Sequence, residues 1–343
     1  MQISTPRYRE LADAPNSSVL PGWLVDAARE CWSLDVSSRD IGSTVLVRAE
    51  SDLGFARCSY ELNLFCNYDC QICYLGEKVS AGLPWDQRER LLRMMAESGV
   101  LWLQLTGGEP LIDRFFPQVY ELAFDLGMMI TVSSNGSRLA DPSILDLLTT
   151  RRPYRMTLSV YGASKESYDA QTQRRGSHAK FIQGLDAAKE ADLPVKLSLI
   201  VTKDSEDEVD QMIALADKYG FPFHIYSNMS PTIHGGAESL PSQSAAHLKP
   251  RSVFTGCNAG HTHYHVDPLG KASICKIGRD PNVDLMTEGA QGLRRLNAIG
   301  DALLTRQGGC SGCTKSGTCG TCMPLANIYR QAEAPLASYC QHG

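Results

Sequence analysis

The stretch FCNYDCQICY, residues 65–74, places three cysteines within eight positions. Three residues separate Cys66 from Cys70, and two separate Cys70 from Cys73. The residues before them, 59–65, alternate polar and apolar side chains, which predicts a strand that runs into a cysteine-bearing loop. Three thiolates at this spacing can bind one face of a cubane iron–sulfur cluster, which normally takes four cysteine ligands. The missing fourth ligand leaves one iron open to a substrate or cofactor.

Composition and charge narrow the class of protein. The chain has 343 residues, a formal net charge of −5 and 43% hydrophobic residues, as expected of a soluble globular protein. A weakly acidic surface gives no electrostatic reason to expect nucleic acid or a membrane as partner. The N-terminus lacks the apolar core of a signal peptide, so we expect a cytoplasmic protein. In that reducing compartment the twelve cysteines indicate metal or redox chemistry rather than disulfides.

The middle of the chain alternates strand and helix patterns about six times, which predicts an α/β fold with a parallel sheet and helices outside. Six units are too few for a complete eight-unit barrel, so we predict an open, partial (β/α)6 TIM-type barrel. The expected strands are 59–65, 100–105, 128–133, 155–160, 195–201 and 222–227.

The composition predicts four parts. A Gly-, Ser- and Pro-rich stretch that reads as a linker follows the last strand, and a cysteine-rich segment follows the linker. We expect this last segment to be a small domain held together by metal rather than by an apolar core. The parts are an N-terminal segment 1–55, the partial barrel 56–229, the linker 230–256 and the C-terminal domain 257–343.

The cysteine spacing after a first strand, with Gly-Gly-Glu-Pro at residues 107–110 after the second, resembles the radical S-adenosylmethionine (radical SAM) superfamily. The resemblance implies that Cys66, Cys70 and Cys73 hold a 4Fe-4S cluster whose open iron binds SAM. It also implies that one electron cleaves SAM to a 5′-deoxyadenosyl radical, which removes a hydrogen atom from the substrate. A zinc site, the alternative, would require a fourth Cys or His nearby, and the chain offers none between Cys73 and His178.

The same resemblance assigns residues at the strand ends to SAM. Gly107 and Gly108 allow close backbone approach, and Glu109 offers an acceptor to the methionine ammonium group. Relatives usually carry an aromatic residue before the third cysteine; here it is Ile72, and we expect Tyr74 to pack against the adenine instead. Either Arg174 or Arg175 can bind the SAM carboxylate, and a solvated basic pair is the alternative for them. For the Asn-Gly pair at residues 135–136, the alternative is a plain turn. The implied set is Tyr74, Gly107, Gly108, Glu109, Pro110, Ser134, Asn135, Ser159, Arg174 and Arg175.

Seven more cysteines follow residue 256, and their spacing resembles the SPASM domain, a C-terminal extension of many radical SAM maturases. The resemblance implies two auxiliary 4Fe-4S clusters; two structural zinc sites are the alternative. One cluster would have three cysteines, and its fourth ligand stays open. His263, in a run with His261 and His265, occupies the position of a cysteine in some relatives and is a candidate ligand; a surface run of histidines is the alternative. An open iron that binds the substrate is also possible. The implied ligands are Cys257, Cys275 and Cys322 for the first cluster, and Cys310, Cys313, Cys319 and Cys340 for the second.

SPASM proteins mostly modify ribosomally made peptides, so the resemblance implies an oxidoreductase that crosslinks a peptide. Lys276 occupies a position where sulfatase-maturing members usually carry aspartate, which argues against that activity. Only 65 residues precede Cys66, too few for the peptide-binding module of many maturases. We therefore expect a separate leader-peptide-binding partner or direct reading of the peptide, and a reductant such as flavodoxin or ferredoxin.

Three residues are candidates for catalysis. Cys58 is a candidate hydrogen-donating thiol, although free cysteines are usually buried small hydrophobes. His234 and Glu238, in the linker expected on the substrate side, are candidate acid–base groups; surface residues are the alternative. Two other functions stay open: an epimerase or dehydrogenase of a small molecule such as an aminoglycoside-like sugar, and a non-catalytic, metal-stabilised scaffold.

Overall fold

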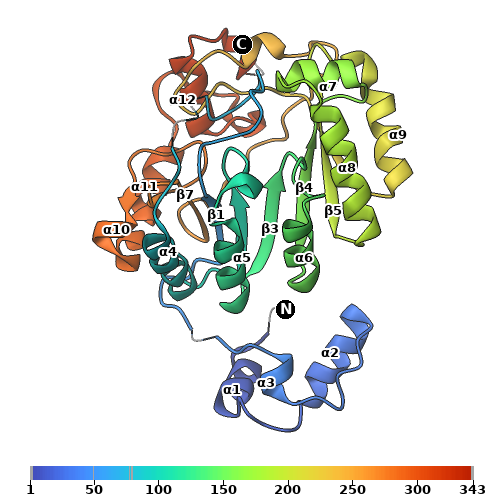
Figure 1. The fold of residues 1–343 in the computed structure, drawn as a ribbon. Helices are drawn as coiled ribbons and strands as arrows, with labels where there is room; N and C mark the ends of the chain where they lie inside the picture. Colours follow the sequence, from blue (N-terminus) through green and yellow to red (C-terminus); the bar gives the residue numbers. More distant parts are fainter. Residues whose placement is uncertain (1–2, 49, 77, 79, 341–343) are drawn as a thin grey trace. The chain divides into compact units, whose positions relative to one another are not determined.

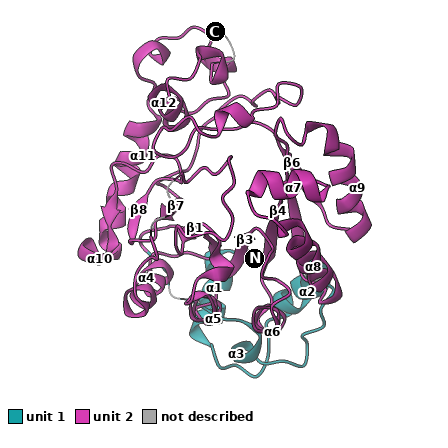
Figure 2. Ribbon diagram, turned by 45° about the horizontal axis from the view of Figure 1, so that its top comes forward, with its two compact units in different colours: residues 1–51 teal, residues 52–343 magenta. Residues whose placement is uncertain are grey.

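A computed structural model describes residues 3–48, 50–76, 78 and 80–340, which form two compact units, 1–51 and 52–343 (Figure 2). The first unit has a small apolar core of its own that includes Leu11, Leu24 and Ile41. Its helices are α1 (Thr5–Asp13), α2 (Gly22–Trp32) and α3 (Ile41–Thr44). No helix among the described residues is long and apolar enough to cross a membrane.

The second unit is built on a sheet in which six neighbouring parallel strands follow the chain order (Figure 1). The sheet does not close on itself, because its outermost strands, β6 and β9, are not paired with each other. The prediction of an α/β fold with an open, partial barrel is therefore confirmed. The strands are β1 (Arg57–Glu61), β2 (Trp102–Thr106), β3 (Met129–Ser134), β4 (Arg155–Val160), β5 (Val195–Ile200) and β6 (Phe223–Tyr226).

Helices cover the apolar face of this sheet (Figure 1). Alternate strand residues such as Leu103, Leu105, Val132 and Leu158 are buried in the core, while the residues between them face the barrel interior and are mostly polar. The pairing register aligns these interior residues from strand to strand, as in the row Ser59–Gln104–Thr131. The helices are α4 (Trp85–Glu97), α5 (Phe116–Asp125), α6 (Pro142–Thr150), α7 (Lys165–Thr172), α8 (Ser177–Glu190) and α9 (Val209–Tyr219).

The C-terminal segment continues the same sheet. Strand β7 (His263–Val266) pairs in parallel with β1, and β8 (Lys271–Ser273) and β9 (Val283–Asp284) follow it antiparallel. Tyr264 and Leu293 are fully buried in the same core as the barrel strands. The expectation that this segment lacks an apolar core is therefore wrong for its first half, because β7 extends the barrel sheet. Its helices are α10 (Leu285–Glu288), α11 (Leu296–Leu304) and α12 (Met323–Gln331).

Short 3-10 helices occur at turns throughout the second unit. They cover Pro110–Ile112, Glu206–Glu208, Leu240–Ser242, Ala290–Arg295, Gly308–Cys310, Ser316–Thr318 and Leu336–Ser338.

The predicted linker 230–256 packs against the barrel. The backbone N–H of Ile233 donates to the carbonyl of Tyr74 (2.9 Å), and the Gln243 side chain accepts from the N–H of Met229 (2.7 Å). Six residues of the stretch are buried: Pro231, Thr232, Gly235, Ser239, Ser242 and Ser244. Hydrogen bonds to the barrel and burial therefore hold this stretch in place, so it is not a free tether.

The shared core predicts that a cavity made in the C-terminal segment destabilises the whole second unit. We expect Leu293→Ala to lower the free energy of unfolding by about 2–5 kcal/mol, because it removes buried methyl groups and leaves a cavity. The matched substitution Leu269→Ala, at a leucine that is 53% exposed, should cost less than about 0.5 kcal/mol. Anaerobic urea titration followed by circular dichroism measures both, and equal effects of the two variants would contradict the shared core.

Candidate active site

The three cysteines of residues 66–73 lie on the loop after β1, and their thiols line one cavity. The loop is held from two sides: the N–H of Asp69 donates to the carbonyl of Thr172 (2.9 Å), and Lys78 Nζ donates to the carbonyl of Tyr68 (2.8 Å). Within the loop, the N–H of Tyr68 donates to the Cys66 sulfur (3.4 Å) and that of Cys73 to the Cys70 carbonyl (3.2 Å). These bonds fix the loop and leave the thiol groups able to bind metal.

The cavity that holds the thiols, called the upper cavity from here on, has a volume of about 440 Å³ and lies at the carboxyl ends of the strands. Most of the residues predicted to contact SAM line it together with the thiols. The structure thus brings together Cys66, Cys70, Cys73, Tyr74, Gly107, Gly108, Ser134, Asn135 and Ser159.

The two glycines are required for a reason that differs from the sequence argument. A Cβ on Gly108 would lie 2.0 Å from the carbonyl oxygen of Phe65, and one on Gly107 would lie 2.5 Å from that of Asn63. The N–H of Gly108 in fact donates to the Asn63 carbonyl (2.9 Å), and that of Glu109 to the Phe65 carbonyl (2.8 Å). The glycines therefore let this loop pack directly against the backbone that leads into the cysteines.

Glu109 lies behind the cavity rather than in its wall. Its side chain is buried and accepts from Ser134 Oγ (2.7 Å) and from the N–H groups of Asn135 (2.7 Å) and Leu111 (3.0 Å). Burial raises the pKa of Glu109 to about 7, although these hydrogen bonds favour the charged form. In this structure Glu109 positions two predicted SAM contacts, and its contact with an ammonium group stays a prediction.

Three other predicted SAM contacts do not reach the upper cavity. Arg174 and Arg175 are exposed on the turn between α7 and α8, and buried Pro110 begins a 3-10 helix behind the glycines. Their assignments also stay predictions. Several residues of the cavity wall were not expected from the sequence, among them Gln104 and Thr157, although both occupy the polar positions of an alternating strand.

A buried carboxylate, Glu61 at the end of β1, connects the cysteine loop to the C-terminal segment. It accepts from Tyr74 Oη (2.9 Å) and from both terminal nitrogens of Arg279 (3.0 and 2.8 Å). His265 Nε2 lies 3.5 Å from Glu61, and its Nδ1 lies 2.7 Å from Ser59 Oγ. Burial opposes the charge of Glu61, but His265 and Arg279 outweigh it and hold the pKa of Glu61 well below its usual value.

The structure relates three of the seven C-terminal cysteines to one another. Cys257 and Cys275 are close enough to Cys322 to act on it electrostatically, and together with burial they raise the pKa of its thiol. The Cys275 sulfur also accepts from the N–H of Gly278 (3.2 Å). Elsewhere in this segment Arg330 Nη2 donates to the Cys310 sulfur (3.1 Å). The ligand sets that include Cys313, Cys319 and Cys340 stay a prediction.

The three histidines expected as a surface run have separate environments. His261 pairs with Asp301 (2.9 Å), His265 is buried against Glu61, and His263 lines a cavity together with Cys275. Only His263 thus shares a cavity with an expected ligand of the first auxiliary cluster.

The catalytic candidates lie in two further cavities. Cys58 is buried in β1, where burial raises its thiol pKa strongly, and it lines the lower cavity, a space of about 660 Å³ nearer the amino ends of the strands. His234 and Glu238 are exposed and line a side cavity of about 550 Å³ together with Cys70 and Cys73. Neither residue lines the upper cavity. Because they share the side cavity with Cys70 and Cys73, this part of the linker lies beside the cysteine loop.

The donor set of the upper cavity fits an iron–sulfur cluster. Burial raises the pKa of the Cys66 thiol to about 11 and that of Cys70 to about 12, so binding of iron must displace protons. Among the described residues no three Cys, His, Asp or Glu side chains converge on a single ion position. A cubane binds each thiolate through a different iron, so its ligands need not converge.

This arrangement defines an open α/β barrel with a three-thiol site at the carboxyl ends of its strands. Residues 60–216 match the Radical SAM superfamily, and the chain therefore contains a radical SAM domain.

The relatives to which this chain is similar are named for different activities. The chain is 29% identical to the AdoMet-dependent heme synthase of Methanosarcina barkeri over 49% of each chain, so it spans about half the length of that relative. It is 26% identical to the mycofactocin maturase MftC of Mycobacterium ulcerans over 63% of this chain and 67% of that protein. The crystal structure of Streptococcus suis SuiB bound to S-adenosylmethionine superposes with a TM-score of 0.62 at 15% identity, covering 84% and 78% of the two chains; SuiB has also been solved with the precursor peptide SuiA.

The Glu61 contacts predict a large loss of stability when the charge is removed. We expect Glu61→Gln to lower the free energy of unfolding by about 3–5 kcal/mol, because Arg279, whose side chain is 17% exposed, loses its charged partner. Tyr74→Phe should cost about 1 kcal/mol, the net value of one hydrogen bond. Urea titration measures both. The control Glu288→Gln breaks the exposed pair with Arg295 and should cost no more than about 1 kcal/mol. If Glu61→Gln also cost no more than this control, the prediction would be refuted.

The raised pKa of Glu109 predicts a carboxyl group that titrates near neutrality. Because the pKa rises on folding from an ordinary 4.5 to about 7, the stabilising contribution of Glu109 is complete below pH 4.5 and is lost as the pH rises through 7. Infrared difference spectra between pH 6 and pH 8 should show loss of a protonated-carboxyl band in the wild type and not in Glu109→Gln. Persistence of that band change in the variant would assign it to another residue.

Proposed function

We propose that this chain is a radical SAM enzyme that oxidatively modifies a ribosomally made peptide, forming a crosslink. The observation that carries the proposal is the upper cavity, in which the thiols of Cys66, Cys70 and Cys73 meet the glycine loop at the carboxyl ends of parallel strands. Open α/β sheets bind their ligands at that edge.

The proposed cofactors are SAM and three 4Fe-4S clusters. When bound, the first cluster supplies the electron that cleaves SAM to a 5′-deoxyadenosyl radical, and the auxiliary clusters accept the electron that the substrate gives up. Around SAM, the side chains of Ser134, Asn135 and Ser159 offer polar contacts, and the Tyr74 ring offers an apolar face.

The proximity of Cys257 and Cys275 to Cys322 supports the first auxiliary set. We assign the second auxiliary set to Cys310, Cys313, Cys319 and Cys340.

The peptide substrate is supported by the kinship with a mycofactocin maturase and by the fold shared with SuiB, which has been solved with its precursor peptide. The name of the heme synthase relative shows that the domain also serves other substrates. Crosslinking requires the peptide to lose two hydrogen atoms. One would reduce the 5′-deoxyadenosyl radical to 5′-deoxyadenosine; the other would leave as a proton and an electron, for which an auxiliary cluster would be the acceptor. A flavodoxin or ferredoxin as reductant, a separate leader-binding protein and a cytoplasmic location belong to the same proposal.

Cys58, His234 and Glu238 stay candidates for proton or hydrogen transfer. Cys58 keeps its hydrogen because burial raises its pKa, which suits a hydrogen donor better than a nucleophile. It borders the lower cavity, but its side chain packs in the core together with Leu103. His234 and Glu238 border the side cavity next to the cysteine loop.

Replacing one thiol of the upper cavity tests the proposal. We expect Cys70→Ala to abolish formation of 5′-deoxyadenosine from SAM under dithionite and to lower the iron content from about twelve to about eight atoms per chain. The control Cys31→Ala changes an exposed cysteine of the first unit and should alter neither quantity. Full turnover by Cys70→Ala would refute the assignment.

The bond that is formed is tested by mass spectrometry of candidate peptides after anaerobic turnover. A product that lacks two hydrogen atoms supports crosslinking. A product of unchanged mass that takes up deuterium from solvent indicates epimerisation and overturns the oxidative proposal. Turnover of an aminoglycoside-like sugar, with none of a peptide, would replace the substrate class.

A further inference from the structure

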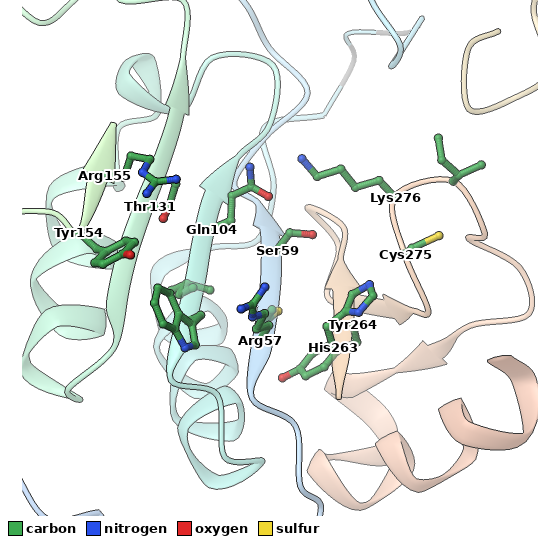
Figure 3. A pocket seen from close by; sticks show the side chains of 14 residues that line it. Arg57, Ser59, Gln104, Thr131, Tyr154, Arg155, His263, Tyr264, Cys275 and Lys276 are labelled. Atoms are coloured by element: carbon green, nitrogen blue, oxygen red, sulfur yellow. The ribbon is translucent and has the colours of Figure 1, made fainter. Parts of the chain in front are cut away.

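The lower cavity has a charge pattern that the proposed reaction does not explain. Its lining includes Arg57, Arg155 and Lys276, with His263 beside them, and contains no Asp or Glu (Figure 3). The chain as a whole carries a net charge of −5, so an excess of cations here runs against its overall balance. Uncompensated guanidinium groups in a recess favour a bound anion.

The two arginines are held in place by aromatic rings. The guanidinium carbon of Arg57 lies 5.4 Å from the centre of the Trp102 ring, and that of Arg155 lies 5.4 Å from the centre of the Tyr154 ring. The two rings pack edge to face, with their centres 4.7 Å apart. A guanidinium that stacks on a ring keeps the N–H donors at its edge free, so each of the two arginines can bind a planar anion.

The arginines have no carboxylate partner in the part of the chain that the structure describes. The ion pairs found there join other residues, such as Arg88 with Asp113 and Arg279 with Glu61. Arg57 and Arg155 are both exposed, so a ligand can reach them from solvent.

The lower cavity adjoins the upper one. Gln104 and Lys276 line both, and Figure 3 shows the Lys276 side chain extending from the C-terminal segment toward Gln104 on β2. Cys275, an expected ligand of the first auxiliary cluster, lines the lower cavity as well. A ligand bound here would therefore lie between the site proposed for SAM and the C-terminal cysteines.

We propose that the lower cavity binds the substrate through a carboxylate, which is attracted by the three cations of the lining, Arg57, Arg155 and Lys276. The inference rests on the proposed peptide substrate and specifies it: the peptide carries an acidic side chain or its C-terminal carboxylate next to the residue that is modified. Trp102, Tyr154 and Ile277 provide an apolar wall for the neighbouring residue of the peptide.

Equilibrium binding to the anaerobically reconstituted full chain with SAM tests this site. The probes are acetyl-Gly-Gly-Glu-Gly-Gly-amide, its Gln counterpart, and inorganic phosphate, each measured by calorimetry. Because no reductant is added, the result does not depend on SAM cleavage, and a failure here is distinguishable from a failure of the proposed function. We expect the Glu peptide to bind roughly 10-fold more tightly than the Gln peptide, since charge-assisted hydrogen bonds are the stronger kind. Raising the salt concentration should reduce that preference.

Variants assign the preference to the two arginines. Arg57→Gln with Arg155→Gln should reduce it to less than about 2-fold, and the corresponding double Lys variant should retain part of it, because lysine keeps the charge but not the planar fork. The control Arg93→Gln, which removes an exposed arginine of α4 that pairs with Glu89, should leave the preference intact. The single variants, each with a smaller loss, replace the double one if it does not fold.

Three outcomes would overturn the assignment. The first is the absence of any preference for the Glu peptide, including no binding of either peptide. The second is a preference that the double Gln variant leaves unchanged. The third is binding of inorganic phosphate without binding of the Glu peptide, which would assign the cavity to phosphate instead.

Discussion

The buried carboxylate of Glu61 is the constraint on which the arrangement of the site depends. A fully buried charge at the end of β1 is tolerated only with charged and hydrogen-bonding partners, and these come from two distant segments. Tyr74 directly follows the last cysteine of the first loop, and Arg279 lies four residues after Cys275. One carboxylate therefore fixes the loop that carries the first thiol site relative to the C-terminal segment that carries the expected auxiliary ligands.

The sheet makes this geometry possible because its two faces differ. Residues such as Leu105 and Val132 pack against helices, while the alternate residues that line the interior are Ser, Thr, Gln and His. A complete barrel would fill its interior with side chains, whereas this sheet is open and polar inside. It leaves two adjoining cavities, one at the carboxyl ends of the strands and one nearer their amino ends. Pairing of β7 with β1 carries His263 and His265 into the same interior.

The barrel strands could be predicted because they are local signals, although β1 covers Arg57–Glu61 and not the expected 59–65. The thiols of one loop likewise line one cavity, while their binding of a cluster stays a prediction. A run such as residues 100–105 is apolar enough to be a buried strand, and three cysteines on one loop need no distant partner. The role of Glu61 could not be predicted, since it looks like an ordinary polar position in an alternating strand and Arg279 lies 218 residues away. Strand β7 was missed because HTHYH reads as a histidine run, although the alternation through Tyr264 and Val266 was the available signal. Arg174 and Arg175 are exposed and do not line the upper cavity, so their assignment to SAM stays a prediction that a motif alone cannot place in space.

The position of Lys276 links the two cavities to the choice of substrate. Its side chain is half-buried and lies over the Tyr74 ring, 5.8 Å from ammonium nitrogen to ring centre. A cation at this position is costly unless something compensates it, and Glu61, the nearby carboxylate, already serves Arg279 and Tyr74. An aspartate at position 276 would be repelled by the negative charge of Glu61 and would leave fewer cations in the barrel interior. With lysine, the interior instead favours a ligand that carries negative charge, and the adjoining arginines give that charge a fixed place. The same side chain that argues against sulfatase maturation thus argues for an acidic substrate.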